Sequence, residues 1–221
     1  MQKLRQAVLF DLDGTLLDSL GDLAESMNAV LREDGLPTHG LDDFRFFIGD
    51  GIQALVKRSL PLRLHNDRPA LEAYLDRYRA SYSQRWHLSK PFAGIADLLD
   101  TLQAQGVGLG IVSNKPDNFT QQCVQTLFPA WTWEGVVGQL DHVPSKPDPT
   151  GALAMAEKLG VQPEDCWFVG DSDVDMKTGV NAGMNVVGVS WGFRPERELR
   201  DAGAQHIIGQ PAELLALLNK D

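Results

Sequence analysis

The sequence predicts a doubly wound α/β fold with an all-helical insertion after its first strand. Short apolar runs rich in β-branched residues alternate with longer helical patterns, which is typical of a parallel sheet covered by helices. The runs are almost continuously apolar, as expected for strands buried on both faces. Residues 18–90 break the alternation, because they contain only helical patterns. The pattern therefore indicates a Rossmann-like parallel sheet core with an inserted all-helical segment.

The elements of the α/β core follow one another along the chain. The runs that predict strands are 7–10, 107–112, 135–138, 166–170, 185–190 and 206–209. The helical patterns between and after them are 91–105, 149–159, 173–182 and 211–218. For the helix at 149–159, Asp148 is the candidate N-cap and Pro149 lies in the first turn. We assign residues 1–17 and 91–221 to the core.

The insertion carries its own series of helical patterns. They cover residues 20–31, 41–48, 52–60 and 69–86. An insertion of this length exceeds an ordinary crossover between strands. We therefore assign residues 18–90 to a helical cap.

Composition narrows the class of protein. The 221 residues include 30 acidic and 20 basic ones, for a formal net charge of −10, without a Lys/Arg cluster. A nucleic-acid partner is therefore not expected. No run approaches the roughly 18 apolar residues of a membrane helix, and the N-terminus lacks the pattern of a signal peptide. We expect no membrane partner and a cytoplasmic location. Cys123 and Cys166 predict neither a zinc site nor a disulfide framework, and the oligomeric state stays open.

Polar side chains follow four of the predicted strands. They are Asp11, Asp13 and Thr15, then Ser113, Asn114 and Lys115, then Lys146, and then Asp171, Asp173 and Asp175. In an open α/β sheet the ligand crevice lies at the carboxyl ends of the strands. We therefore expect these side chains to converge on one site.

The acids at the strand ends need a positive charge nearby. Two carboxylates about 4 Å apart repel by roughly 4 kcal/mol at an effective dielectric constant near 20. Either some of the acids stay protonated or a cation lies among them. An all-oxygen site suits Mg²⁺, particularly when a phosphate completes its coordination. The alternative is that an aspartate merely caps a turn, but the pairing of DLDGT (11–15) with GDS (170–172) favours a metal.

Ser113 and Lys146 fit a phosphorylated ligand at the same strand ends. Ser113 offers a hydroxyl, and the backbone N–H groups of such a loop can hold anionic oxygens. Lys146 supplies a fixed positive charge. Taken singly, each has a simpler reading, because a serine after a strand is often a turn residue and a lysine before Pro-Asp-Pro is often solvated. Their positions at successive strand ends favour the phosphate.

These motifs resemble those of a known family. The segments DLDGT (11–15), SNK (113–115), KP (146–147) and GDS (170–172), followed by Asp175, are similar in kind and order to the four motifs of the haloacid dehalogenase superfamily. The resemblance spans the chain. The helical insertion after the first motif resembles the cap of the phosphoglycolate phosphatase-like branch.

The resemblance implies a covalent mechanism. Asp11 would be the nucleophile that forms an aspartyl-phosphate, and Asp13 would protonate the leaving alcohol and then activate water. Mg²⁺ would be held by Asp11, the backbone carbonyl of Asp13, and Asp171. Relatives that displace halide lack an acid at the position of Asp13, so dehalogenation is not expected.

The resemblance also implies a set of phosphate contacts. The expected phosphate-binding residues are Thr15, Ser113, Asn114 and Lys146. Asp175 would either touch a metal-bound water or orient Lys146, with Ser172 beside it. Asp173 is expected to face solvent or to cap the helix that follows.

The segment Gly49-Asp50-Gly51 is the candidate substrate loop of the cap. It precedes a helix, so it is either a plain turn or a glycine loop that dips over the site and contacts the leaving group. Arg58 could meet a substrate carboxylate or lie on a solvated helix face. Trp131 and Trp133 are expected to pack around a surface connection.

The function that the sequence predicts is Mg²⁺-dependent hydrolysis of a small phosphate monoester, 2-phosphoglycolate or a sugar phosphate, through an aspartyl-phosphate. One alternative is a phosphosugar mutase similar to β-phosphoglucomutase. Such mutases usually carry a basic residue near the cap glycines, where this chain has Asp50. The other alternative is a non-catalytic protein that binds a phosphorylated metabolite, which the full set of acids disfavours.

Overall fold

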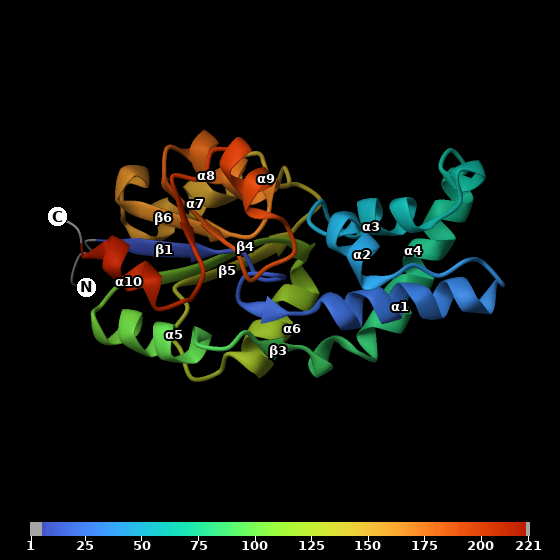
Figure 1. The fold of residues 1–221 in the computed structure, drawn as a ribbon, viewed down its shortest axis with the longest axis horizontal. Helices are drawn as coiled ribbons and strands as arrows, with labels where there is room; N and C mark the ends of the chain where they lie inside the picture. The colour runs from blue at the N-terminus through green and yellow to red at the C-terminus, as the bar shows by residue number, and fades with distance from the viewer. Residues whose placement is uncertain (1–5, 220–221) are drawn as a thin grey trace.

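A six-stranded parallel sheet forms the core of the protein, as the sequence predicts (Figure 1). The computed structural model describes residues 6–219; residues 1–5 and 220–221 of the predicted core lie outside this range. The strand order is β5-β4-β1-β6-β7-β8. The strands are β1 (Ala7–Phe10), β4 (Gly108–Pro116), β5 (Gly135–Gln139), β6 (Cys166–Gly170), β7 (Asn185–Val189) and β8 (His206–Ile208). β4 extends past its predicted end, so Ser113, Asn114 and Lys115 belong to the end of a strand and not to a loop.

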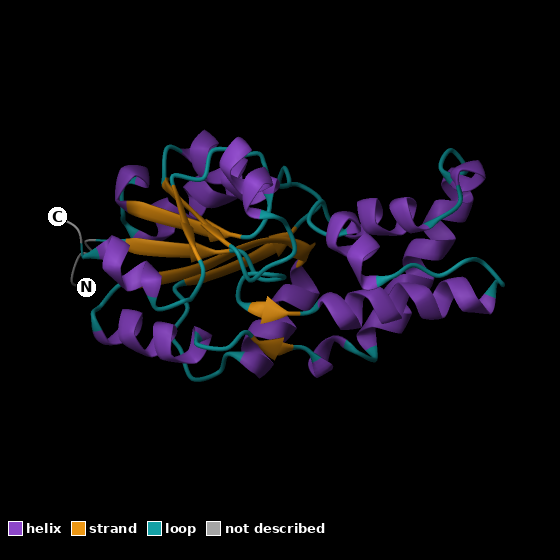
Figure 2. Cartoon of the chain, in the orientation of Figure 1, coloured by secondary structure: helices purple, strands orange, loops and turns teal. Residues whose placement is uncertain are grey.

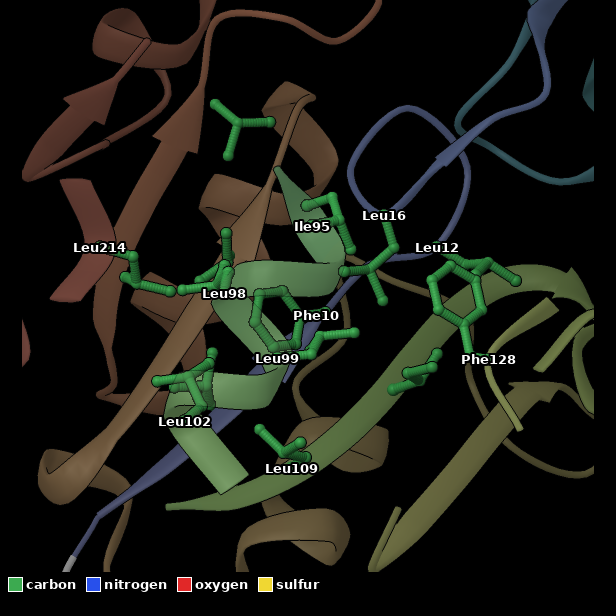
Figure 3. Packing of buried hydrophobic residues seen from close by; sticks show 14 of the residues in the cluster. Phe10, Leu12, Leu16, Ile95, Leu98, Leu99, Leu102, Leu109, Phe128 and Leu214 are labelled. Atoms are coloured by element: carbon green, nitrogen blue, oxygen red, sulfur yellow. The ribbon is translucent and has the colours of Figure 1, made fainter. Parts of the chain in front are cut away.

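Helices cover both faces of the sheet, and β1 shows why. Val8 and Phe10 belong to a cluster on one face with α5 (Ile95–Ala104), whereas Ala7 and Leu9 pack on the other face with α7 (Thr150–Leu159). This alternation reflects the period of two along a strand. In Figure 3 the leucines of α5 pack against Phe10. A strand that is buried on both faces must be apolar throughout, which explains the continuous runs in the sequence.

The helices of the core differ from the prediction in two ways. The prediction missed α6 (Asp117–Leu127) and α9 (Glu196–Asp201). The buried stripe of α6 includes Thr120, which weakens its apolar period, and α9 has only 6 residues. The predicted α8 (Asp173–Ala182) is confirmed, and α10 runs over Glu213–Leu218.

The predicted N-cap of α7 is wrong by one residue. The N-cap position of α7 is Pro149, while Asp148 accepts a hydrogen bond at 2.9 Å from the backbone N–H of Thr150. The side chain of Asp148 therefore closes a turn to the backbone of Thr150, just before the helix begins.

The segment after β1 forms a helical lobe beside the sheet (Figure 2). Its helices are α1 (Leu20–Glu33), α2 (Leu41–Phe47), α3 (Ile52–Ser59) and α4 (Arg68–Ser83). We call α1 to α4 and their connections the cap. The cap has a hydrophobic cluster of its own, which Phe119 and Phe193 of the core join. No helix within residues 6–219 is both long and apolar enough to cross a membrane.

A short antiparallel ribbon lies where the cap meets the core. β2 (Leu17–Asp18) pairs with β3 (Lys90–Pro91). The two predicted junctions between cap and core, at 17/18 and 90/91, therefore lie side by side. The exact division of the chain at these residues stays a prediction.

The remaining predictions about cysteines and tryptophans concern packing. Cys123 and Cys166 are buried and free. Trp131 and Trp133 both pack against Phe128, and the indole N–H of Trp131 donates to Asp100 at 2.8 Å. The expected packing role of the two tryptophans is confirmed.

Candidate active site

The carboxylates that follow β1 and β6 meet because these strands are neighbours. Phe10 pairs with Val169, and the backbone N–H of Asp11 continues the ladder with a 2.9 Å bond to the carbonyl of Val169. Asp11 and Asp171 therefore leave the sheet side by side. With Asp175, they form a buried group whose carboxylate oxygens lie within 4.8 Å of one another.

Lys146 neutralises part of this acidic group. Its Nζ lies 2.8 Å from Asp11 Oδ1 and 2.7 Å from Asp175 Oδ1. Burial would lower the pKa of Lys146, but Asp11 and Asp175 together raise it above its usual range. Lys146 is therefore a buried cation between two carboxylates, and not the solvated lysine of the simpler reading.

Asp175 orients Lys146, which is one of the two roles predicted for it. Its other carboxylate oxygen accepts bonds from the backbone N–H and the hydroxyl of Ser172, at 3.0 and 2.6 Å. Ser172 in turn is the N-cap of α8. Both oxygens of Asp175 thus have protein partners, and one of these partners is the ammonium of Lys146.

Asp171 is held in place by partners from two other segments of the chain. Thr15 Oγ1 donates to one carboxylate oxygen at 3.2 Å, and the backbone N–H of Phe193 donates to the other at 2.7 Å. Gly14, at φ +90°, allows the approach, because a Cβ there would lie 2.3 Å from Asp171 Oδ2. Thr15 therefore contacts Asp171 in this structure, whereas the sequence predicted a phosphate contact.

The raised pKa values of Asp11 and Asp171 fit a metal site. Burial raises the pKa of Asp11 to about 6, against the opposing effect of Lys146. Burial, followed by the charges of Asp175 and Asp11, raises the pKa of Asp171 well above its usual range. One lysine does not satisfy three buried carboxylates, and a hard divalent cation with oxygen ligands is the group that such a donor set suits. The predicted set of Asp11, Asp171 and the backbone carbonyl of Asp13 remains consistent with this geometry.

The carboxylate of Asp13 lies apart from the group formed by Asp11, Asp171 and Asp175, and it is paired with a second lysine. Lys115 Nζ lies 2.8 and 2.9 Å from the two carboxylate oxygens of Asp13. Ser19 donates its hydroxyl proton to the same carboxylate at 2.6 Å. No role for Lys115 or Ser19 is predicted from the sequence. For Lys115 a signal was present, because it falls within the SNK motif at a strand end.

Ser113 and Asn114 lie at the same edge of the sheet. Ser113 lines the cavity between core and cap, and its oxygen accepts only a 3.3 Å bond from the backbone N–H of Lys115 among the described contacts. The amide of Asn114 donates to the carbonyls of Gly49 and Lys146, and accepts from the N–H of Lys146. Asn114 thus ties the core to the cap loop, so its predicted phosphate contact would need its backbone.

A small cavity of about 40 Å³ separates the strand ends from the cap. From the core it is lined by Asp11, Asp13, Ser113, Asn114, Lys115, Pro116 and Phe119; the cap contributes the apolar side of the wall, including Ile52, Leu55, Tyr78 and Tyr82. The rings of Tyr78 and Tyr82 are stacked, 6.0 Å apart. Both hydroxyls are buried and have no hydrogen-bond partner within residues 6–219.

The cap glycines approach the site, whereas the charged residues beside them do not. Gly49 and Gly51 line the cavity, and Gly51, at φ +86°, brings the loop close to the carbonyl of Asn114. Asp50 forms an ion pair with Arg58 at 2.6 Å, and neither is among the residues that line the cavity. Arg58 also donates to the carbonyls of Phe46 and Phe47. The structure therefore places Arg58 on the cap surface, away from the expected substrate position.

Asp173 lies outside the group of acids at the strand ends, and it does not cap α8. It is the first residue of α8, and its carboxylate pairs with Lys177 at the helix surface. Of the two alternatives predicted for Asp173, the structure favours the surface position, because Ser172 already occupies the N-cap.

Comparison with known proteins finds hydrolases and phosphatases that are similar to this chain in sequence and in structure. A model of the haloacid dehalogenase-like hydrolases matches residues 8–189. The chain is 30% identical to phosphoglycolate phosphatase 1 of Pseudomonas aeruginosa, over 96% of this chain and 79% of that one. It is 34% identical to N-acetylmuramic acid 6-phosphate phosphatase of the same organism, over 100% and 98% of the two chains. A crystal structure of a predicted phosphoglycolate phosphatase from Haemophilus somnus superposes with a TM-score of 0.88 at 26% identity, covering 98% and 99% of the chains.

Proposed function

The chain belongs to the haloacid dehalogenase-like hydrolases, and on that premise we propose that it is a Mg²⁺-dependent phosphatase. Its substrate is a small phosphate monoester, and the reaction passes through an aspartyl-phosphate on Asp11. The observation that supports this most strongly is the buried group at the strand ends, in which Lys146 joins Asp11 to Asp175 beside Asp171. A carboxylate next to a fixed cation can accept a phosphoryl group and split one difficult step into two.

In the first step, a carboxylate oxygen of Asp11 attacks phosphorus and the bond from phosphorus to the ester oxygen breaks. Asp13, in its protonated form, gives its proton to the departing ester oxygen, so the alcohol leaves neutral. In the second step, Asp13 takes a proton from water as the water oxygen attacks phosphorus. Inorganic phosphate leaves, and the Asp11 carboxylate is restored.

Charge neutralisation comes from the groups around Asp11. Lys146 stabilises the charge that develops on the phosphoryl oxygens, and Ser113 donates its hydroxyl to one of them. Asp11, Asp171 and the carbonyl of Asp13 would hold Mg²⁺, whose charge lowers the repulsion between the nucleophile and the phosphate. Asp175 and Ser172 keep Lys146 in place.

The leaving group is small in this proposal, because the cavity beside Asp13 is small. Relatives named as phosphatases of phosphoglycolate and of N-acetylmuramic acid 6-phosphate support a phosphorylated acid or sugar as the substrate. We therefore keep 2-phosphoglycolate and a sugar phosphate as the two candidates.

The mutase alternative gains no support from the cap. Among the described residues that line the cavity, those from the cap include no Lys or Arg, and Asp50 is paired with Arg58. A second phosphate on the leaving group would therefore meet no cation from the cap.

The proposal is tested with purified protein and three substrates: p-nitrophenyl phosphate, 2-phosphoglycolate and glucose 6-phosphate. We expect release of inorganic phosphate that requires MgCl₂ and stops with EDTA. An isomerised sugar phosphate without phosphate release would support a mutase. Binding of the esters without any conversion, with MgCl₂ supplied, would leave only the non-catalytic alternative.

A further inference from the structure

Lys115 is a buried cation that the proposed mechanism does not use. Its side chain is 2% exposed, and it contacts Asp13 through both carboxylate oxygens. Burial would lower the pKa of Lys115, but Asp13 raises it well above its usual range. The protein therefore holds two charged lysines at the strand ends. Lys146 lies at the metal group, and Lys115 lies on the side of the leaving group.

The surroundings of Lys115 resemble the wall of a binding site more than a structural ion pair. Lys115 Nζ lies 4.8 Å from the centre of the Tyr82 ring, and the cavity beyond it is lined by apolar side chains of the cap. Burial raises the pKa of Tyr78 and Tyr82, so both phenols stay protonated donors. Their unpartnered hydroxyls add two groups for which a ligand oxygen would be a suitable partner.

We propose that Lys115 determines substrate specificity by binding an anionic group of the leaving group. The ligand class is a phosphate ester whose ester carbon itself bears a carboxylate, as in 2-phosphoglycolate. The inference rests on the proposed function, because it assumes that Asp13 faces the ester oxygen. Tyr78 and Tyr82 form the wall that encloses this carboxylate.

The distances limit where that anionic group can be. In proton transfer, the ester oxygen lies about 2.6–3.2 Å from a carboxylate oxygen of Asp13. Lys115 Nζ lies 2.8–2.9 Å from the same carboxylate. The ammonium is therefore within roughly 6 Å of the ester oxygen, close enough for a hydrogen bond of about 2.8 Å to a carboxylate two carbons along. An anion on the far side of a sugar ring lies beyond this reach.

No other described cation serves that position equally well. Lys146 is engaged by Asp11 and Asp175, and Arg58 does not line the cavity. Lys115 has three N–H donors, so it can keep one bond to Asp13 while it binds a second carboxylate. Because the side chain of Lys115 is buried, the attraction between its ammonium and a carboxylate is stronger than at the surface.

The inference is tested by the ratio of two kcat/KM values, for 2-phosphoglycolate and for its uncharged amide. We expect wild-type protein to prefer the acid by at least tenfold, as expected when a charge-assisted hydrogen bond is lost. Lys115→Met lowers activity on both esters, since Asp13 loses its partner, and brings the ratio close to one. Lys115→Arg retains a preference for the acid. A merely structural role for Lys115 predicts equal losses on both esters and an unchanged ratio.

Tyr82→Phe is the matched variant, because it removes one hydroxyl and leaves the charge of Lys115. We expect it to reduce the preference for the acid by a few-fold only. Circular dichroism shows whether each variant is folded. A wild-type ratio near one overturns the inference without any variant, and so does a folded Lys115→Met that keeps the wild-type ratio. In both results the esters are still hydrolysed, whereas no hydrolysis of either ester would overturn the proposed function itself.

Discussion

The two sides of the cavity are built on opposite principles. On the core side, lysines hold the acids in place: Lys146 bridges Asp11 and Asp175, and Lys115 contacts Asp13. On the cap side, the wall is apolar, and its two buried hydroxyls have no hydrogen-bond partner among the residues that the structure describes. A preorganised set of charges suits chemistry that is the same for every ester. An apolar wall with two tyrosine hydroxyls that can donate hydrogen bonds suits recognition of one leaving group.

Asp11→Asn should give the largest effect, because it removes the nucleophile and keeps the shape. We expect kcat for p-nitrophenyl phosphate to fall by about a thousandfold or more. The fold should be kept, since Asn is isosteric and Lys146 retains Asp175. Phosphate release measured with saturating Mg²⁺ provides the check, and near-normal turnover would remove Asp11 from its role.

Lys146→Met should reduce the rate by about 100- to 1,000-fold and also destabilise the protein. The substitution leaves the buried carboxylates of Asp11 and Asp175 without their cation, which costs about 3–5 kcal/mol. Urea unfolding followed by circular dichroism measures the second effect. A variant as stable as the wild type would show that Lys146 is not the partner of these acids in solution.

The ionisation of Asp11 should also make the stability of the protein depend on pH. Its pKa in the folded protein, about 6, exceeds the ordinary value of 3.8, so its contribution to stability is present below about pH 4 and is lost as pH rises through 6. In EDTA, the melting temperature of Asp11→Asn relative to wild type should therefore rise between pH 4.5 and 7. Added Mg²⁺ should raise the melting temperature of the wild type more at pH 7 than at pH 5. A difference between the two proteins that does not change with pH would contradict the raised pKa.

Gly51→Ala should give a smaller effect, confined to the cap. At φ +86° a side chain costs about 1–3 kcal/mol, and its Cβ would lie 3.4 Å from the carbonyl of Asn114. We expect KM to rise several-fold with a small change in kcat, because the loop would shift while the charges of the core stay in place. Gly21→Ala is the control, since that position in α1 has no atom within 4 Å of an added Cβ. Equal kinetics for the two variants would show that the loop does not contact the substrate.

The same contrast explains what the sequence could predict. The strands, the cluster of acids and Lys146 were predictable, because buried parallel strands read as apolar runs and their ends carry the chemistry. The pairing of Lys115 with Asp13 was not, because it joins residues 102 apart in the chain and depends on side-chain packing. The cavity wall was equally hidden, since Tyr78 and Tyr82 belong to an amphipathic helix whose buried face looks the same whether it covers a core or a ligand. For Arg58 the sequence left a substrate contact and a solvated helix face open, and the ion pair with Asp50 at the cap surface favours the second.

The most direct test of the central claim is to trap the phosphoryl group on the protein. Wild-type protein is mixed with 2-phosphoglycolate and Mg²⁺, quenched during turnover and treated with borohydride, which reduces an aspartyl-phosphate to homoserine. Peptide mass spectrometry should find this change at Asp11, and it should be absent from Asp11→Asn. Steady release of phosphate with an unmodified Asp11, or with the modification at another residue, would contradict the claim that the core side of the cavity works through this carboxylate.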